Sequence, residues 1–235
     1  STATLVRHFQ LFDDALKGMD YCICYAMKAA SNQAILKTLG NLGAGMDVVS
    51  GGEYRRAISA GIPPEKVVFS GVGKTLEEIT LALQNGIRQF NVESDSELEK
   101  ISSIASSMDK IAPIAIRINP DVDAQTHEKI ATGKAENKFG IPLSRAREVY
   151  SKASQLPGIS IMGIDLHIGS QLTELEPFKK AYQKLADLTH ILRQDGHKIK
   201  RLDLGGGLGI PYEKNKSAPP LPAEYGKMVS EVLGH

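Results

Sequence analysis

One lysine, one histidine and a run of three glycines are the residues whose types and positions best suit chemistry. Lys28 follows the apolar residues 23–27, where an amine is partly desolvated and its neutral, nucleophilic form is favoured. His167 also ends an apolar run, and the run Gly205-Gly206-Gly207 leaves backbone N–H groups free to approach an anion. Each feature has a plainer alternative: a lysine that reaches water at the end of a strand, a packed structural histidine, and a flexible turn.

Three other kinds of site are not expected. No second histidine or carboxylate stands at ligand spacing from His167, so the sequence predicts no metal site. Residues 70–75 look like the end of a nucleoside-triphosphate-binding loop, but that pattern requires a glycine five residues before Gly73, where Val68 stands. The glycines at 205–207 also do not fit the dinucleotide-binding pattern G-x-G-x-x-G with an acidic residue about 20 positions later.

The spacing of apolar residues predicts a helix over residues 4–16, followed by seven units of a strand and a helix. The expected strands are residues 21–28, 46–49, 66–70, 89–93, 111–119, 160–168 and 199–204. The expected helices are residues 32–42, 53–60, 76–85, 96–107, 144–155, 176–194 and 222–233, the first with Ser31 and the third with Thr75 as N-cap. Between them, residues 120–140 form a polar loop whose length favours a function.

Strands that alternate with helices indicate a parallel sheet with right-handed crossovers. We therefore expect an α/β fold, either a doubly wound sheet or a (β/α)₈ barrel of the TIM type. The even spacing of the units, and a length close to the ~250 residues of such barrels, favour the barrel. Because seven units are present and an eighth strand is absent, residues 1–235 are predicted to form one incomplete barrel domain.

Chemistry in such a barrel takes place at the carboxyl ends of the strands. All seven expected strands place a polar residue or a glycine turn at that end, which a purely structural barrel does not need. These residues are Lys28, Asp47, Ser70, Glu93, Arg117 with Asn119, His167 and Asp203. The glycines at 205–207 follow the seventh strand, where barrels often bind phosphate.

The composition is that of a globular protein with a small-molecule partner. The chain has 235 residues, 42% of them hydrophobic and 23% charged, and its formal net charge is +1. This balance favours neither nucleic acid nor an anionic membrane as a partner, and no apolar run reaches the roughly 18 residues of a membrane span. The only cysteines, Cys22 and Cys24, point to one face of an extended segment and cannot pair without distortion. We therefore expect a reducing, cytoplasmic environment.

These residues together resemble a known family. The matching runs include YAMKA at 25–29, GAGMDVVSGGE at 43–53, HIGSQ at 167–171 and DLGGGLGIPY at 203–212, and the likeness covers nearly the whole chain. They are similar to the decarboxylases that use pyridoxal 5′-phosphate (PLP) on an alanine-racemase-like barrel, and within these to the diaminopimelate decarboxylases. The resemblance implies that Lys28 carries PLP as a Schiff base, that His167 stacks on the cofactor ring, and that Ser170 and the three glycines hold the phosphate.

The resemblance also implies supporting residues and one local departure. Asp47 and Arg117 match positions near the cofactor, and Glu53 matches a carboxylate near the lysine. Lys138 lies in a loop that in the family approaches the partner subunit of a homodimer. Where the family usually has asparagine after the Lys-Ala pair, this chain has Ala30, which leaves the lysine itself intact.

The reaction implied by the resemblance is the loss of the α-carboxylate of meso-diaminopimelate as CO₂, giving L-lysine in the last step of lysine biosynthesis. An ornithine- or arginine-type decarboxylase, a barrel that binds PLP or a partner protein without catalysis, and a barrel with no cofactor are the alternatives. The family's Glu-Pro-Gly-Arg segment, which matches the eighth strand, and its C-terminal β-domain have no counterpart in these 235 residues. We therefore expect a fragment with little or no decarboxylase activity by itself.

Overall fold

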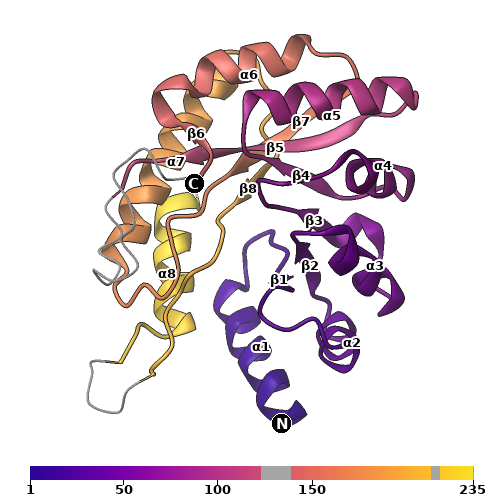
Figure 1. The fold of residues 1–235 in the computed structure, drawn as a ribbon. Helices are drawn as coiled ribbons and strands as arrows, with labels where there is room; N and C mark the ends of the chain where they lie inside the picture. The colour runs from indigo at the N-terminus through magenta and orange to yellow at the C-terminus, as the bar shows by residue number, and fades with distance from the viewer. Residues whose placement is uncertain (123–138, 213–217, 235) are drawn as a thin grey trace.

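The chain folds into an incomplete β/α barrel in the computed structural model, which describes residues 1–122, 139–212 and 218–234 (Figure 1). Seven strands lie side by side in the order of the sequence, and each is parallel to the next. They are β1 (Cys24–Ala26), β2 (Gly45–Val48), β3 (Val67–Phe69), β4 (Gln89–Val92), β5 (Ala112–Asn119), β7 (Ile159–Asp165) and β8 (Arg201–Asp203). Because the order never reverses, the doubly wound alternative is excluded.

The helices cover the outer face of this sheet (Figure 1). They are α1 (Thr2–Leu16), α2 (Gln33–Asn41), α3 (Gly51–Ser59), α4 (Leu76–Gln84), α5 (Asp95–Ser107), α6 (Ala146–Gln155), α7 (Glu176–Gln194) and α8 (Pro222–Leu233), with 3₁₀ turns η1 (Pro64–Lys66) and η3 (Leu143–Arg145). The two ends of the chain meet where α1 packs on α8: the rings of Phe12 and Tyr225 stack with centroids 5.7 Å apart. Gly226 permits this approach, since a Cβ there would overlap the carbonyl oxygen of Ala15.

Hydrogen bonds across the interior show that the sheet is curled into a barrel. Asn91 of β4 donates to the Asp203 carboxylate of β8 at 3.0 Å, although these strands are not neighbours. Nearer the amino ends of the strands, the Arg201 guanidinium donates to the carbonyl oxygen of Arg88 at 3.0 Å. In the sheet formed by the described residues, β1 and β8 each pair with a single neighbour, so the wall is open between them.

Three of the helices begin with the same local signal, directly after a strand. Ser50, Thr75 and Ser94 each accept a hydrogen bond from the backbone N–H of a glutamate three residues later, at the start of α3, α4 and α5. This side-chain cap satisfies one of the N–H groups that the first turn of a helix leaves unpaired. The short strand-to-helix loops fix where each strand ends, and therefore where its last polar side chain lies.

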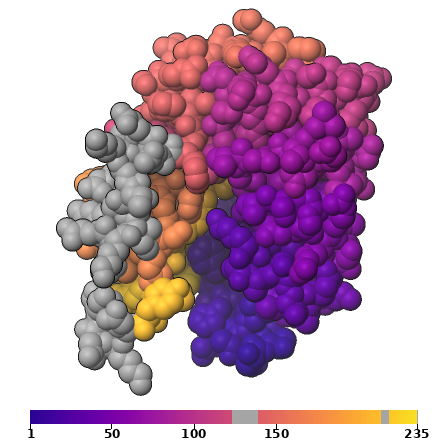
Figure 2. Space-filling view, viewed as in Figure 1, coloured from indigo at the N-terminus to yellow at the C-terminus, as the bar shows by residue number. Residues whose placement is uncertain are grey.

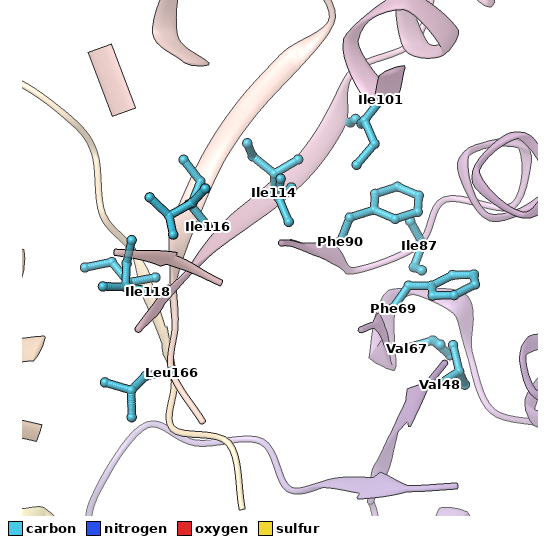
Figure 3. Packing of buried hydrophobic residues seen from close by; sticks show 14 of the residues in the cluster. Val48, Val67, Phe69, Ile87, Phe90, Ile101, Ile114, Ile116, Ile118 and Leu166 are labelled. Carbon is cyan, nitrogen blue, oxygen red and sulfur yellow. The ribbon is translucent and has the colours of Figure 1, made fainter. Parts of the chain in front are cut away.

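The core lies between the strands and the helices. Alternate strand residues point outward into this layer, and Figure 3 shows Phe69, Phe90 and Ile114 among them. All three are fully buried. At about 25 cal/mol per Å² of apolar surface, burial of such side chains is the main term that holds the helices on the sheet. The opposite strand faces point into the barrel, where polar residues gather.

The expected elements agree with the structure in number and order, and differ at their ends. Helices 176–194 and 222–233 are confirmed residue for residue. The first strand is three residues long instead of eight, because only Cys24–Ala26 pair with β2. Ser31 is not the N-cap of α2; Asn32 is, because its side chain accepts from the Ala34 N–H at 2.9 Å. A further two-residue strand, β6 (Ile141–Pro142), pairs with β5 and was not expected.

Candidate active site

Lys28 lies in the turn that follows β1. The Ala29 N–H donates to the carbonyl oxygen of Ala26 at 3.1 Å, which closes the turn, and the N–H of the buried Met27 donates to the Asp47 carbonyl at 3.0 Å. These bonds attach the turn to β2, while the Lys28 side chain is exposed. The expected desolvation of this amine is therefore not found within these 235 residues.

A hydrogen-bonded network crosses the barrel interior close to Lys28. Ser70 donates to the Asp47 carboxylate at 2.6 Å, and Asn91 donates to the Ser70 oxygen at 3.1 Å. The Asn91 amide nitrogen also donates to the Asp203 carboxylate at 3.0 Å, and the Asn91 amide oxygen accepts from the Gln89 side chain at 2.8 Å. The network therefore joins β2, β3, β4 and β8, and it ends at the loop that carries the three glycines.

Asp47 is the member of this network that titrates near neutral pH. Burial raises the pKa of its carboxyl group to about 6, and the neighbouring carboxylate of Asp203 acts in the same direction. The Ser70 hydroxyl and the Lys28 ammonium oppose this rise, since both stabilise the ionised form. The carboxyl group beside Lys28 can therefore gain or lose a proton around pH 6.

Asp47→Asn is expected to stabilise the chain above pH 6 and to lose that advantage in acid. The pKa is about 6 in the folded state against an ordinary value of 3.8, so ionised Asp47 costs folding free energy above pH 6, on the order of 2 kcal/mol, and the cost vanishes below the unfolded pKa. Asparagine keeps an acceptor for Ser70. Urea unfolding at pH 4 and pH 7.5 measures this, with the exposed Asp20→Asn as control. An equal effect of Asp47→Asn at both pH values would contradict the expectation.

Arg117, on β5, lies between two buried carboxylates. It donates to Glu93 at 2.7 Å, and its Nε lies 3.9 Å from the Asp165 carboxylate. Burial holds the pKa of Asp165 well above its usual range, and the charge of Asp203 adds to the rise. The second oxygen of Glu93 is buried without a hydrogen-bond partner among the described residues. Arg117 therefore supplies a fixed positive charge in a region that is rich in carboxylates.

His167 lies two residues beyond the end of β7, and it presents a neutral ring. Its Nδ1 accepts a hydrogen bond from the Gly206 N–H at 3.3 Å, which places the ring proton on Nε2. Burial, together with the positive charges of Arg117 and Lys28, lowers the pKa of His167 to about 4. At neutral pH the His167 ring is uncharged, so its flat face can pack against another ring without burying a charge.

The glycine run forms a turn that other residues cannot adopt. Gly205 and Gly207 have φ angles of +65° and +110°, in the left-handed region. A Cβ on Gly207 would overlap the carbonyl oxygen of Gly169, whereas a Cβ on Gly206 would have no atom within 4 Å. The Gly205 N–H donates to Asp203 at 3.0 Å, so this turn is joined to the interior network.

The loops after β7 and β8 are held together as one unit. Leu172 and Leu208 form a parallel bridge, in which the Leu172 N–H donates to the Gly207 carbonyl at 2.8 Å and the Gly209 N–H donates to the Leu172 carbonyl at 2.8 Å. Ser170 is exposed in the first of these loops. The hydroxyl of Ser170 and the glycine turn therefore belong to the same rim, beside His167.

The structure brings Lys28, Asp47, Arg117, His167 and the glycine turn to the carboxyl ends of the strands. Figure 2 shows that the surface is hollowed between the indigo N-terminal segments and the yellow C-terminal ones. Glu53 has a local role, since its carboxylate accepts from the Val49 N–H at 2.8 Å at the start of α3. Lys138 lies outside the described residues, as do residues 123–138 of the loop 120–140 that was expected to have a function.

Sequence reasoning missed the buried pair of Lys74 and Glu97. The Lys74 ammonium donates to the Gly71 and Asn91 carbonyls and to the Glu97 carboxylate, each at 2.7 Å. The other oxygen of Glu97 accepts from the Glu93 N–H at 2.7 Å. The pair therefore fixes the end of β4, where Glu93 holds Arg117. The S-x-x-E spacing at 94–97 was the available signal, because it places Glu97 in the first turn of α5.

Comparison with known proteins decides the family. A family model described as the pyridoxal-binding domain of pyridoxal-dependent decarboxylases matches residues 2–235. The chain belongs to this family. The diaminopimelate decarboxylase of Haemophilus influenzae is 52% identical over 233 residues, which cover 99% of the chain and 56% of the relative. That of Vibrio cholerae is 50% identical, over 99% of the chain and 55% of the relative.

Solved structures agree with this assignment. Diaminopimelate decarboxylase from Helicobacter pylori, in complex with L-lysine, matches with a TM-score of 0.94 at 41% identity, over 100% of the chain and 59% of that structure. The chain spans about half the length of the curated relatives it matches. None of the helices in the described part of the chain is long and apolar enough to cross a bilayer.

The rim fits the cofactor of a pyridoxal-dependent decarboxylase. PLP combines an aldehyde, a flat ring and a phosphate. An exposed amine, a neutral histidine ring and a tight glycine turn, in which a Cβ on Gly205 or Gly207 would overlap a backbone carbonyl oxygen, lie on one rim. The donor set of the site therefore matches the chemistry of the group.

Proposed function

We propose that this chain is the PLP-binding barrel domain of a decarboxylase that converts meso-diaminopimelate to L-lysine. The observation that carries the proposal is the meeting of Lys28, His167 and the glycine turn at one rim, in a chain whose relatives at 50–52% identity are diaminopimelate decarboxylases. A likeness to a structure solved with L-lysine, the product of that reaction, supports the same substrate class.

Each residue of the rim has a task in this proposal. When bound, PLP supplies an electrophilic carbonyl and a ring that withdraws electrons from the bond to be broken. Lys28 provides the amine that attaches the cofactor and that the substrate amine replaces. His167 packs its neutral face on the ring, and Ser170 with Gly205, Gly206 and Gly207 holds the phosphate.

Charged groups around the rim set the protonation of the bound molecules. Arg117, held by Glu93 at 2.7 Å, keeps a positive charge beside the cofactor position. Asp47 exchanges its proton around pH 6 and lies near enough to Lys28 for the two charges to interact. Oriented charges of this kind, fixed before substrate arrives, lower the barrier without reorganisation during the reaction.

We further propose that turnover requires parts that these 235 residues do not include. The relatives extend well beyond the matched region, since the chain covers 55–56% of their length. A homodimer and a cytoplasmic location are the arrangement we propose for the complete enzyme. Ornithine or arginine decarboxylation, and PLP binding without catalysis, remain the competing readings. Assay of the complete enzyme with meso-diaminopimelate, ornithine and arginine separates them.

The lysine that holds the cofactor can be tested directly. We expect that incubation of the chain with PLP, followed by borohydride reduction and peptide mass spectrometry, places a pyridoxyl group on Lys28 in preference to the exposed Lys100 and Lys179. Lys28→Ala should lose this label and leave the labelling of surface lysines unchanged. Equal labelling of all lysines, in the chain and in the complete enzyme, would overturn the assignment of Lys28.

A further inference from the structure

The two cysteines form a close pair at the opposite end of β1 from Lys28. Their sulfur atoms lie 3.9 Å apart, and Cys24 pairs with Gly45 in the sheet while Cys22 precedes the strand. Cys22 is exposed and Cys24 is partly buried. Gly45 leaves room for the inner thiol, since a Cβ there would lie 3.0 Å from the Cys24 sulfur. The pair takes no part in the proposed decarboxylation.

The charges around the pair favour ionisation of the outer thiol. A hydrogen bond from Cys24, together with the positive charges of Arg88 and Lys66, lowers the pKa of Cys22 to about 6. The same shared proton raises the pKa of Cys24, which also faces the carboxylate of Asp203. Arg201 of β8 interacts with Cys22 as well. Cys22 is exposed while Cys24 is partly buried, so Cys22 is the thiol that a soluble disulfide can reach, and its lowered pKa favours the reactive thiolate.

The backbone permits a bond between the two sulfurs, under strain. Residues two apart in an extended strand have Cα atoms about 6.6 Å apart, near the upper end of the usual disulfide range. The sulfurs must approach from 3.9 Å to a bond length of about 2.05 Å. Cys22 can supply that movement, since the paired residues of β1 begin at Cys24. A strained disulfide is easily reduced, which suits a reversible modification and not a structural cross-link.

We propose that Cys22 and Cys24 form a thiol–disulfide exchange site for low-molecular-weight disulfides, with Cys22 as the attacking thiol and Cys24 as the resolving thiol. The Cys22 thiolate attacks one sulfur of a disulfide RSSR, forms a Cys22–S–S–R bond and expels RS⁻. The expelled RS⁻ takes the proton of Cys24, whose sulfur attacks the Cys22 sulfur, forms the Cys22–Cys24 disulfide and expels the second RS⁻. The protein loses two electrons and two protons, and RSSR becomes two thiols.

Oxidised glutathione and mass spectrometry test this site on the full chain at pH 6. The mass of the wild-type chain is expected to fall by that of two hydrogens, with no glutathione retained. Dithiothreitol should restore the original mass. Cys24→Ser should retain one glutathionyl group on Cys22. Cys22→Ser should react about tenfold more slowly, because the lowered pKa of Cys22 gives it a much larger thiolate fraction at this pH than an ordinary thiol has, and this outweighs its lower nucleophilicity.

Three outcomes would overturn the proposal. The first is equal reaction rates for Cys22→Ser and Cys24→Ser, which would mean that the surrounding charges do not select Cys22. The second is a stable glutathionyl adduct on wild type, which would mean that Cys24 does not resolve it. The third is no reaction of wild type. Far-UV circular dichroism of each variant shows whether the fold is retained, and none of these outcomes depends on PLP.

Discussion

Lys74→Met is expected to lower the free energy of unfolding by about 3–5 kcal/mol. The ammonium group is fully buried and satisfies two carbonyl oxygens and the Glu97 carboxylate. Methionine keeps the length of the side chain but leaves that carboxylate buried without its cation. The cost of such an unpaired charge exceeds the net value of the ion pair itself. Since the chain has no tryptophan, urea unfolding followed by far-UV circular dichroism is the suitable measurement.

A second variant separates the buried charge from the loss of packing. In Lys74→Met/Glu97→Leu the orphaned carboxylate is gone, so we expect part of the lost stability to return. The exposed Lys100→Met on α5 should leave the unfolding midpoint unchanged. If Lys74→Met unfolded at the same urea concentration as wild type, the pair would not be what fixes the end of β4. If the double variant were less stable than the single one, the cost would arise from packing and not from charge.

Gly207→Ala is expected to weaken PLP binding by roughly 100-fold, which corresponds to about 2.7 kcal/mol. The φ angle of +110° is unfavourable for alanine, and its Cβ would overlap the carbonyl oxygen of Gly169. The turn must therefore open, and with it the bridge between Leu172 and Leu208. Titration of the chain with PLP, followed by absorbance of the bound cofactor, gives the dissociation constant for each variant.

Gly206→Ala is the matched control for this change. Gly206 does not have a positive φ, and an added Cβ would have no atom within 4 Å. We therefore expect its dissociation constant to stay within about threefold of wild type, well under the 1.4 kcal/mol of a tenfold change. Equal losses in both variants would show that the glycine run is needed for its flexibility, and that the shape of the turn at Gly207 does not matter.

The fold could be predicted from the sequence because its signals are local and repeated. Seven apolar strands alternate with amphipathic helices, and caps such as Thr75 mark where the helices begin. The barrel was preferred over the doubly wound sheet only on spacing and length. The contact between Asn91 and Asp203, 112 residues apart, is what demonstrates curvature. No local pattern encodes such a contact.

The residues of the candidate site could be predicted from the sequence, but the burial and the partners of their side chains could be predicted less well. Position at the end of an apolar strand identified Lys28 and His167, and the structure places both at the expected rim. The same argument predicted a desolvated Lys28, but the side chain is exposed within these residues, because desolvation depends on neighbours in space and not on position along a strand. Asn91 and Asp165 were missed, because the partners of a polar residue inside a buried strand can be identified only in the three-dimensional structure.

The hydrogen bond between Asn91 and Asp203 has a mechanical consequence. It links β4 to β8 across the barrel interior at 3.0 Å, although these strands are not neighbours in the sheet. A curved sheet can flex by bending, and a hydrogen bond between two distant strands opposes that motion. The distance between the glycine turn and the strand that precedes Lys28 then depends on hydrogen bonds inside the barrel as well as on the pairing of neighbouring strands.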